Sequence, residues 1–327
     1  MALMNKSISA SEFDDSPLVV IAIGGNSLIK DDQHRSVLDQ YNAMGETARH
    51  IVPIVSEGYR VVVTHGNGPQ VGFILLRSDL AREVLHQVPL ASCVADTQGA
   101  IGYQVAQTLQ NELHLQGIHR DVAAVVTQVV VAADDPGFGH PDKPIGPFMT
   151  KADAEKRVSE DGWVVGEDAG RGWRRLVPAP APIEIIELNS IRALLDHGTL
   201  VVAVGGGGIP VVRQADGTLA GRDAVVDKDA ASCVLAIELG ASVLIKSTSV
   251  DKVALNFGTP QQVDIDLMTA AECRRYLRQG HFAPGSMQPK MEAALAFLEQ
   301  GGERVIITRP HHLEEALHGI YGTHIVP

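Results

Sequence analysis

Residues 60–72 read "RVVVTHGNGPQVG", an apolar run followed by a turn that contains Gly66, Gly68 and Gly72. The segment after the turn has the pattern of a helix. Glycine permits positive φ and lets a ligand approach the main chain, and a helix N-terminus offers free N–H groups to an anion. The stretch predicts a strand, an anion-binding turn and a helix. A plain turn remains the alternative, and the glycine spacing differs from the dinucleotide fingerprint.

Similar apolar runs recur along the chain, at 18–25, 123–131, 199–206, 242–248 and 304–308. They are continuously apolar, as strands buried on both faces of a parallel sheet must be. Helical patterns lie between several of them, at 37–56, 97–116, 228–239 and 287–300. The alternation predicts an α/β fold with a sheet between helical layers. Residues 132–182 break the rhythm because they are rich in Pro, Gly and charge, and we expect a small excursion that covers a site.

Composition limits the classes of function. The 327 residues have 27 basic and 39 acidic side chains, a formal net charge of −12, so nucleic-acid binding is not expected. No apolar run is long enough to cross a membrane, and the three cysteines are far apart, which fits a reducing cytoplasm. Residues 1–16 lack a secretory-signal core and are expected to be a disordered arm.

Glycines and polar residues follow the predicted strands, at 24–26, 65–68, 205–208 and 248–249. Ligands of open α/β sheets bind outside the carboxyl ends of the strands. Four such strand ends are therefore expected to converge on one binding site.

Three lysines lie in Gly, Pro and Asp contexts: Lys143, Lys228 and Lys290. A single lysine is usually a solvated surface charge, but three lysines at one phosphate site would stabilise a transferring phosphoryl group. Asp229, next to Lys228 at a predicted helix start, can hold two of them in register. A P-loop sequence is missing, so a P-loop enzyme is not expected.

The thirteen histidines are scattered and show no ligand pair on a helix. We therefore expect no metal site built from protein side chains. Mg²⁺ carried by a nucleotide is the expected cofactor.

Together the motifs resemble the carbamate kinases, within the amino acid kinase fold family. The matching pieces run from about 18 to 327: "IAIGGNSLI", "THGNGPQVG", "QGAIGYQ", "DKPIGPF", "GRGWRRLVPAP", "VGGGGIPV", "VVDKDAAS", "VDKVALNFG" and "GHFAPGSMQPKMEAA". The resemblance implies an open, mostly parallel sheet of about eight strands sandwiched by helices, with a protruding subdomain at about 132–182. It also implies a homodimer.

The resemblance further implies two lobes. Residues 17–215 would form the carbamate or carbamoyl phosphate side, including the subdomain, and residues 216–327 the nucleotide side. The implied catalytic residues are Lys143, Lys228, Asp229 and Lys290. The implied substrate-binding residues are Gly24, Gly25, Asn26, Gly66, Asn67, Gly68, Gly206 and Gly207.

The implied nucleotide-binding residues are Thr248, Ser249, Asp251, Ala254 and Met287. Family members usually read close to "LTDVDKVY" where this chain has "STSVDKVA" at 247–254. Ser249 thus replaces an expected Asp and Ala254 an aromatic residue. Lys246 also puts a charge in a strand that is normally apolar.

The expected activity is interconversion of carbamate plus ATP with carbamoyl phosphate plus ADP, in the cytoplasm and in arginine metabolism. Two alternatives remain open. One is a paralogue that binds carbamoyl phosphate with weak or absent turnover, and the other is a kinase for another small carboxylate.

Overall fold

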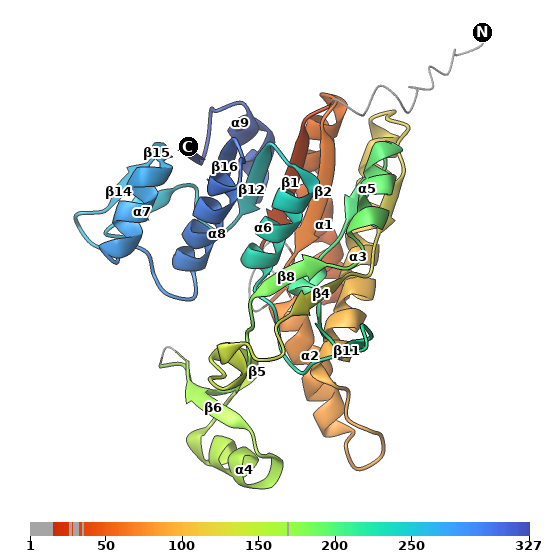
Figure 1. Ribbon diagram of the computed structural model, residues 1–327, viewed down its shortest axis with the longest axis vertical. Coiled ribbons are helices and arrows are strands. Elements are labelled where there is room, and N and C mark those ends of the chain that lie inside the picture. Colours follow the sequence, from red (N-terminus) through yellow and green to blue (C-terminus); the bar gives the residue numbers. More distant parts are fainter. Residues whose placement is uncertain (1–15, 26–27, 29–32, 35, 169) are drawn as a thin grey trace.

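The computed structural model describes residues 16–327 except 26–27, 29–32, 35 and 169. The predicted disordered arm therefore lies outside the described residues, apart from Ser16. Figure 1 shows a main body that contains both termini of the described chain, with a smaller unit projecting from one end.

An eight-stranded sheet forms the centre of the main body, in the order β15-β17-β16-β12-β1-β2-β9-β3. Its strands in chain order are β1 (Leu18–Ile23), β2 (Arg60–His65), β3 (Val122–Ala124), β9 (Leu200–Val202), β12 (Val243–Ser247), β15 (Leu267–Thr269), β16 (Arg304–Thr308) and β17 (Thr323–Val326). Every neighbouring pair is parallel except β16 with β17. The prediction of an open, mostly parallel sheet is confirmed.

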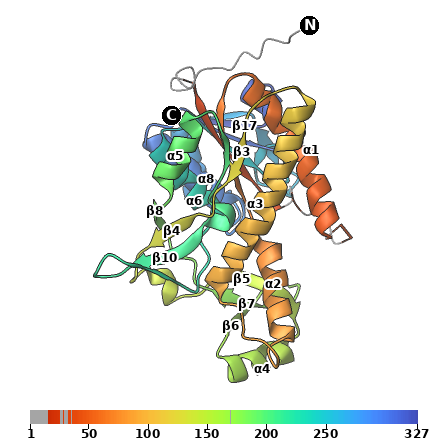
Figure 2. The ribbon, with the colours of Figure 1, turned by 90° about the vertical axis from the view of Figure 1, so that its right-hand side faces the viewer.

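Helices cover both faces of this sheet because its strands are apolar on both sides. In β1, Val19 and Ile21 pack into one core and Leu18 and Val20 into the other. The first core includes α1 (Val37–Ser56), α3 (Leu90–Leu115) and α9 (Leu313–Leu317); the second includes α5 (Leu188–Asp196), α6 (Lys228–Leu239), α7 (Ala270–Arg278) and α8 (Met287–Glu299). Figure 2 shows α1 and α3 on one side and α5, α6 and α8 on the other.

The predicted strand at 123–131 divides between two sheets, which corrects that prediction. Its first part, β3, ends the central sheet. Its second part, β4 (Gln128–Val131), joins a four-stranded sheet with β8 (Pro182–Ile185), β10 (Ile209–Arg213) and β11 (Leu219–Gly221). Between them the Thr127 N–H donates to the Gln98 side chain over 2.7 Å. That bond to a helix replaces a ladder bond and turns the chain out of the central sheet.

The prediction of a small protruding subdomain is confirmed, and its elements lie within the predicted range of about 132–182 (Figure 1). The subdomain consists of a three-stranded antiparallel sheet, in the order β5-β7-β6, and one helix. The elements are β5 (Lys143–Met149), α4 (Lys151–Asp161), β6 (Val164–Glu167) and β7 (Trp173–Val177), preceded by the short helix η3 (Pro136–Phe138). Figure 1 shows this unit projecting from the main body near α2 (Gly68–Leu80).

The division into lobes at 215 and 216 stays a prediction. The central sheet is continuous across it, because β1 from the first half pairs with β12 from the second. The second half also carries the hairpin β13 (Val253–Leu255) and β14 (Val263–Ile265) and the short helix η5 (Pro310–His312). Within the described ranges, no helix has the length and apolar character needed to cross a membrane.

Candidate active site

The carboxyl ends of the central strands meet at one cavity of about 300 Å³. Twelve of the predicted site residues line it: Gly24, Gly25, Gly66, Asn67, Gly68, Lys143, Gly206, Lys228, Asp229, Thr248, Ser249 and Lys290. Gly24 lies so close to β12 that a Cβ there would be 2.9 Å from the Ser247 carbonyl oxygen. Asn26 lies outside the described residues. The structure thus brings the predicted strand ends together, as parallel strands require.

Three helices begin at this cavity. Gly68 is the first residue of α2, Lys228 is the first residue of α6, and Ser286 is the N-cap of α8, and all three line the cavity. A helix N-terminus carries a partial positive charge and unpaired N–H groups, both of which favour an anion. Their convergence makes the cavity suited to a phosphoryl group.

The glycine turn after β9 packs against its neighbours at distances that exclude side chains. This turn, η4 (Gly205–Gly207), follows Val204, which has φ 52° and so lies in the left-handed region. A Cβ on Gly206 would lie 2.0 Å from the amide nitrogen of Asn67. That amide donates to Thr97 over 2.8 Å. Gly207 packs beside the cavity wall, where a Cβ would lie 2.2 Å from the Val226 carbonyl oxygen.

Asp229 is the centre of a buried cluster of charges. Its Oδ2 accepts a hydrogen bond from Lys290 Nζ at 2.8 Å, and its Oδ1 lies 3.6 Å from Lys228 Nζ. Lys246 Nζ also lies 3.6 Å from Oδ1. The predicted pairing of one aspartate with Lys228 and Lys290 is present, and a third ammonium completes the group.

The charges of this group act on one another strongly because they are shielded from water. Burial acts to raise the pKa of Asp229, but Lys228, Lys246 and Lys290 outweigh it and hold that pKa well below its usual range. Burial lowers the pKa of Lys228. The charge of Asp229 opposes this lowering, and the charge of Lys290 adds to it. The cluster therefore holds one ionised carboxylate among three lysine side chains, and this excess of basic groups favours an anion in the cavity.

Lys143 reaches the same cavity from the protruding subdomain. Its Nζ donates to Asp227 Oδ2 over 2.9 Å, while Asp227 Oδ1 accepts from the backbone N–H of Asp229 and so caps α6. Burial acts to raise the pKa of Asp227 and Lys143 overcomes this effect, so the pKa is lowered. One aspartate thus positions a helix N-terminus and joins the subdomain to it.

His65, at the end of β2, lies beneath the glycine turn. Its ring is 1% exposed, and Nδ1 lies 3.0 Å from the Gly66 carbonyl oxygen, so that nitrogen donates in the neutral ring. Burial lowers the pKa of His65 to about 4. The hydrogen bond to Gly66 opposes this lowering, and the charge of Lys228 adds to it. His65 is therefore a neutral packing group at physiological pH.

We expect the free energy of unfolding to fall as the pH drops from 6.5 to about 4, because the unfolded chain binds a proton that folded His65 excludes. A pKa difference of 2.5 corresponds to about 3 kcal/mol at the lower end. Urea unfolding at several pH values, for the unmodified chain and for His65→Gln, measures this. His50 and His324 contribute equally to both proteins. Identical slopes of unfolding free energy against pH in the two proteins would contradict the assignment of this low pKa to His65.

The predicted nucleotide residues separate into two groups. Thr248 and Ser249 line the cavity, whereas Asp251, Ala254 and Met287 lie outside its lining. Asp251 forms an ion pair with Arg309, Nε to Oδ1, at 3.0 Å. Ala254 is 6% exposed within β13, and Met287 packs against the core. Their binding role stays a prediction.

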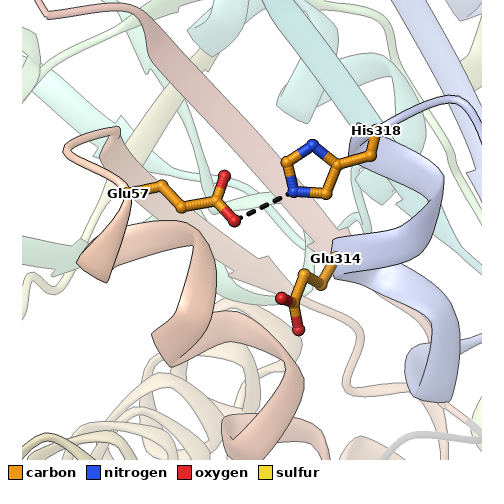
Figure 3. A group of neighbouring side chains, drawn as sticks. All are labelled: Glu57, Glu314 and His318. Carbon is orange, nitrogen blue, oxygen red and sulfur yellow. Dashed lines mark hydrogen bonds and ion pairs between the residues drawn. The ribbon is translucent and has the colours of Figure 1, made fainter.

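A possible metal-binding group lies away from the cavity, between α1 and α9. The ligand atoms of Glu57, Glu314 and His318 lie within 4.8 Å of one another, and His318 Nε2 is 2.9 Å from Glu57 Oε1 (Figure 3). Glu57 and His318 are exposed, which is common for such groups without an ion. The prediction that protein side chains form no metal site therefore stays a prediction.

A larger cavity, of about 1090 Å³, lies between α2 and the protruding subdomain. Its walls include Leu76, Trp163 and Arg175, and they contain none of the predicted site residues. Volume alone therefore does not locate the chemistry, and the charged cavity at the strand ends is the stronger candidate for phosphoryl transfer.

Two charged residues of the site are not among the sequence predictions. The sequence indicates Lys246 only as a departure within an apolar strand, whereas in the structure it faces Asp229. Asp227 is not among the predicted site residues, although it binds Lys143 and caps α6. The signal for Asp227 was available, because an aspartate directly before a helical pattern is a favoured N-cap.

Fold and site together define a phosphotransferase-type α/β protein with an anion cavity at the strand ends. The model of the amino acid kinase family matches residues 17–309, and the chain belongs to that family. Among its relatives, the chain is 48% identical to carbamate kinase-like protein YahI of Escherichia coli, over 94% of this chain and 98% of that one. It is 44% identical to carbamate kinase of Pyrococcus horikoshii, over 94% of this chain and 99% of that one.

Solved structures agree with these relatives. The structure of carbamate kinase from Giardia lamblia bound to AMP-PNP superposes with a TM-score of 0.90 at 37% identity. The match covers 95% of this chain and 99% of the Giardia chain.

Proposed function

We propose that this protein is a carbamate kinase that interconverts carbamate plus ATP with carbamoyl phosphate plus ADP. The observation that carries the proposal is the Asp229 cluster, with Lys228 and Lys290 on the wall of a cavity where three helices begin. Relatives at 43–48% identity over nearly the full chain, most of them named carbamate kinases, supply the substrate class.

The chemistry explains why the site is rich in lysines. In the direction of ATP synthesis, a β-phosphate oxygen of ADP attacks the phosphorus of carbamoyl phosphate. The bond from phosphorus to the carbamate oxygen breaks, and carbamate leaves with the electron pair. Nucleophile and leaving group are both anions, so no proton has to move. The protein must therefore position two anions and stabilise charge on the moving group, which is work for cations and helix N-termini.

Each charged residue then has a role that follows from its position. Lys228, at the first turn of α6, and Lys290, in α8, offer positive charge to the phosphoryl group from two elements. Lys143 adds a third cation from the subdomain, and its bond to Asp227 keeps the subdomain against the main body. Gly24, Gly25 and Gly66 leave the main chain open to the ligand, as glycine does at phosphate sites.

Mg²⁺ is proposed to enter with the nucleotide. Asp227 and Asp229 on the cavity wall each pair with lysine, so phosphate oxygens and water are the expected ligands of the ion. This donor set fits an ion carried by ATP or ADP. When bound, the ion neutralises charge on the phosphates.

Family membership also supports a homodimer, a cytoplasmic location and a place in arginine metabolism, and we include these in the proposal. A dimer would have a mass of about 70 kDa, twice the 34.9 kDa of one chain. Light scattering on the purified protein measures this mass, and a value near that of a single chain would contradict the dimer.

Comparison of acyl phosphates tests the substrate assignment. We expect ATP formation from ADP to be at least about tenfold faster in kcat/KM with carbamoyl phosphate than with acetyl phosphate, because binding groups outside the reacting centre distinguish substrates by 1.4 kcal/mol or more. A coupled hexokinase assay measures both rates. Preference for acetyl phosphate would favour the kinase of another small carboxylate. Carbamoyl phosphate binding in calorimetry without any ATP formation would favour a binding protein.

A further inference from the structure

Lys246 is a buried lysine in the central strand β12, directly before Ser247, which lines the cavity. Its side chain is 0% exposed, and its strand β12 lies between β1 and β16. Its cross-strand partners are Ala22 and Ile307. An ammonium group in such surroundings costs free energy that an apolar side chain of similar size would not. A buried lysine therefore calls for a compensating partner and a function.

The partner of Lys246 is Asp229. Lys246 Nζ lies 3.6 Å from Asp229 Oδ1 and 3.5 Å from the Asp229 carbonyl oxygen, to which it donates. The same carboxylate serves Lys228 and Lys290. Three positive charges and one negative charge give these four residues a net charge of +2 when all are ionised. Asp227, the next aspartate, is bound to Lys143.

The structure points to Lys246 as a positioning residue. We propose that it binds Asp229 from beneath and shares its negative charge, so that Lys228 and Lys290 remain incompletely neutralised and available to a phosphoryl group. This rests on the proposed function only in that the cavity binds a phosphoryl group. Without Lys246, Asp229 would neutralise the other two lysines more fully, and the group with all its members ionised would carry +1 instead of +2.

The groups that face Lys246 support this role. Asp229 and Cys233 come from α6, together with Lys228, and Lys290 comes from α8. Burial lowers the pKa of Lys246, and Lys228 and Lys290 lower it further, while Asp229 and Cys233 oppose the effect. An anion in the cavity adds negative charge and favours the protonated form, so phosphate binding and the charge on Lys246 reinforce each other.

The test replaces Lys246 with methionine, which has similar volume and no charge. We expect the dissociation constant for inorganic phosphate, measured by calorimetry without nucleotide, to rise about tenfold or more. We also expect kcat for ATP formation to fall about tenfold or more at saturating substrates. The melting temperature should stay the same or rise, because Asp229 keeps two lysine partners and a desolvated ammonium is removed.

This combination separates a positioning role from a structural one. A structural lysine would lower the melting temperature on replacement and leave phosphate affinity unchanged. The matched control is Lys252→Met, because Lys252 lies outside the cavity lining and pairs with Asp266 on the surface. It should leave both phosphate affinity and kcat at the unmodified values.

Two results would overturn the proposal. The first is a folded Lys246→Met protein with unchanged phosphate affinity and kcat. The second is loss of folding in both Lys246→Met and Lys246→Ile, a side chain suited to the strand, because the lysine would then serve the fold. Failure of the unmodified protein to form ATP would refute the proposed function instead, and the phosphate comparison would still decide the role of Lys246.

Discussion

Replacing Lys290 with alanine is expected to lower kcat and kcat/KM together, by a factor of about 10² or more. Its ammonium lies on the cavity wall, 2.8 Å from Asp229, and its side chain is 16% exposed. Charge spreads over the transferring phosphoryl group mainly in the transition state, so a cation placed there stabilises that state more than the bound substrate. Lys228→Ala is expected to behave in the same way.

Initial rates over a range of carbamoyl phosphate and ADP concentrations measure this effect. Lys252→Ala, outside the cavity, is the control and should retain the unmodified values. Asp229 keeps two other lysines when Lys290 is removed, so the fold should persist. A rise in KM with kcat unchanged would contradict the assignment of Lys290 to the transition state.

Replacing Gly207 with alanine is expected to destabilise the fold strongly. Gly207 has φ +93°, and a Cβ there would lie 2.2 Å from the Val226 carbonyl oxygen. The conformation alone costs an alanine about 1–2 kcal/mol. The contact is with backbone, so relief requires movement of the segment that leads into Asp227 and Lys228. We expect a total loss of about 3 kcal/mol or more in the free energy of unfolding, and reduced activity in any folded fraction.

Gly217→Ala is the matched control for this prediction. Gly217 has a similar φ of +86°, and a Cβ there would have no neighbour within 4 Å. It should lose only the conformational part, about 1–2 kcal/mol. Urea unfolding of the two variants gives the comparison. Equal losses of unfolding free energy would contradict the prediction, because the contact with Val226 would then contribute nothing.

Much of the fold follows from the sequence because buried parallel strands are continuously apolar and bounded by glycine. The run at 123–131 shows where this signal fails. It is apolar throughout, but Gln98 on α3 bonds to the N–H and C=O of Thr127 and redirects the chain into another sheet. A contact between residues 29 positions apart leaves no mark on local periodicity.

The candidate site, like the fold, is only partly predictable from the sequence. Lys228, Asp229 and Lys290 lie in recognisable motifs, and the structure places them together. The sequence marks Lys246 as a charge in an apolar strand but does not indicate its partner, since only the packing of α6 against β12 brings a carboxylate to it. Asp251 is close in sequence to Thr248 and Ser249, but it turns toward Arg309, which the strand pattern could not predict.

Direct transfer of the phosphoryl group is the central claim, and phosphorus NMR of the unmodified protein with carbamoyl phosphate, ADP and Mg²⁺ tests it most directly. We expect the carbamoyl phosphate signal to be replaced by the γ-phosphate signal of ATP, with turnover on the order of 1–10³ s⁻¹ as is usual for enzymes. Hydrolysis of carbamoyl phosphate to inorganic phosphate at the rate seen without protein, with no ATP formed, would contradict direct phosphoryl transfer.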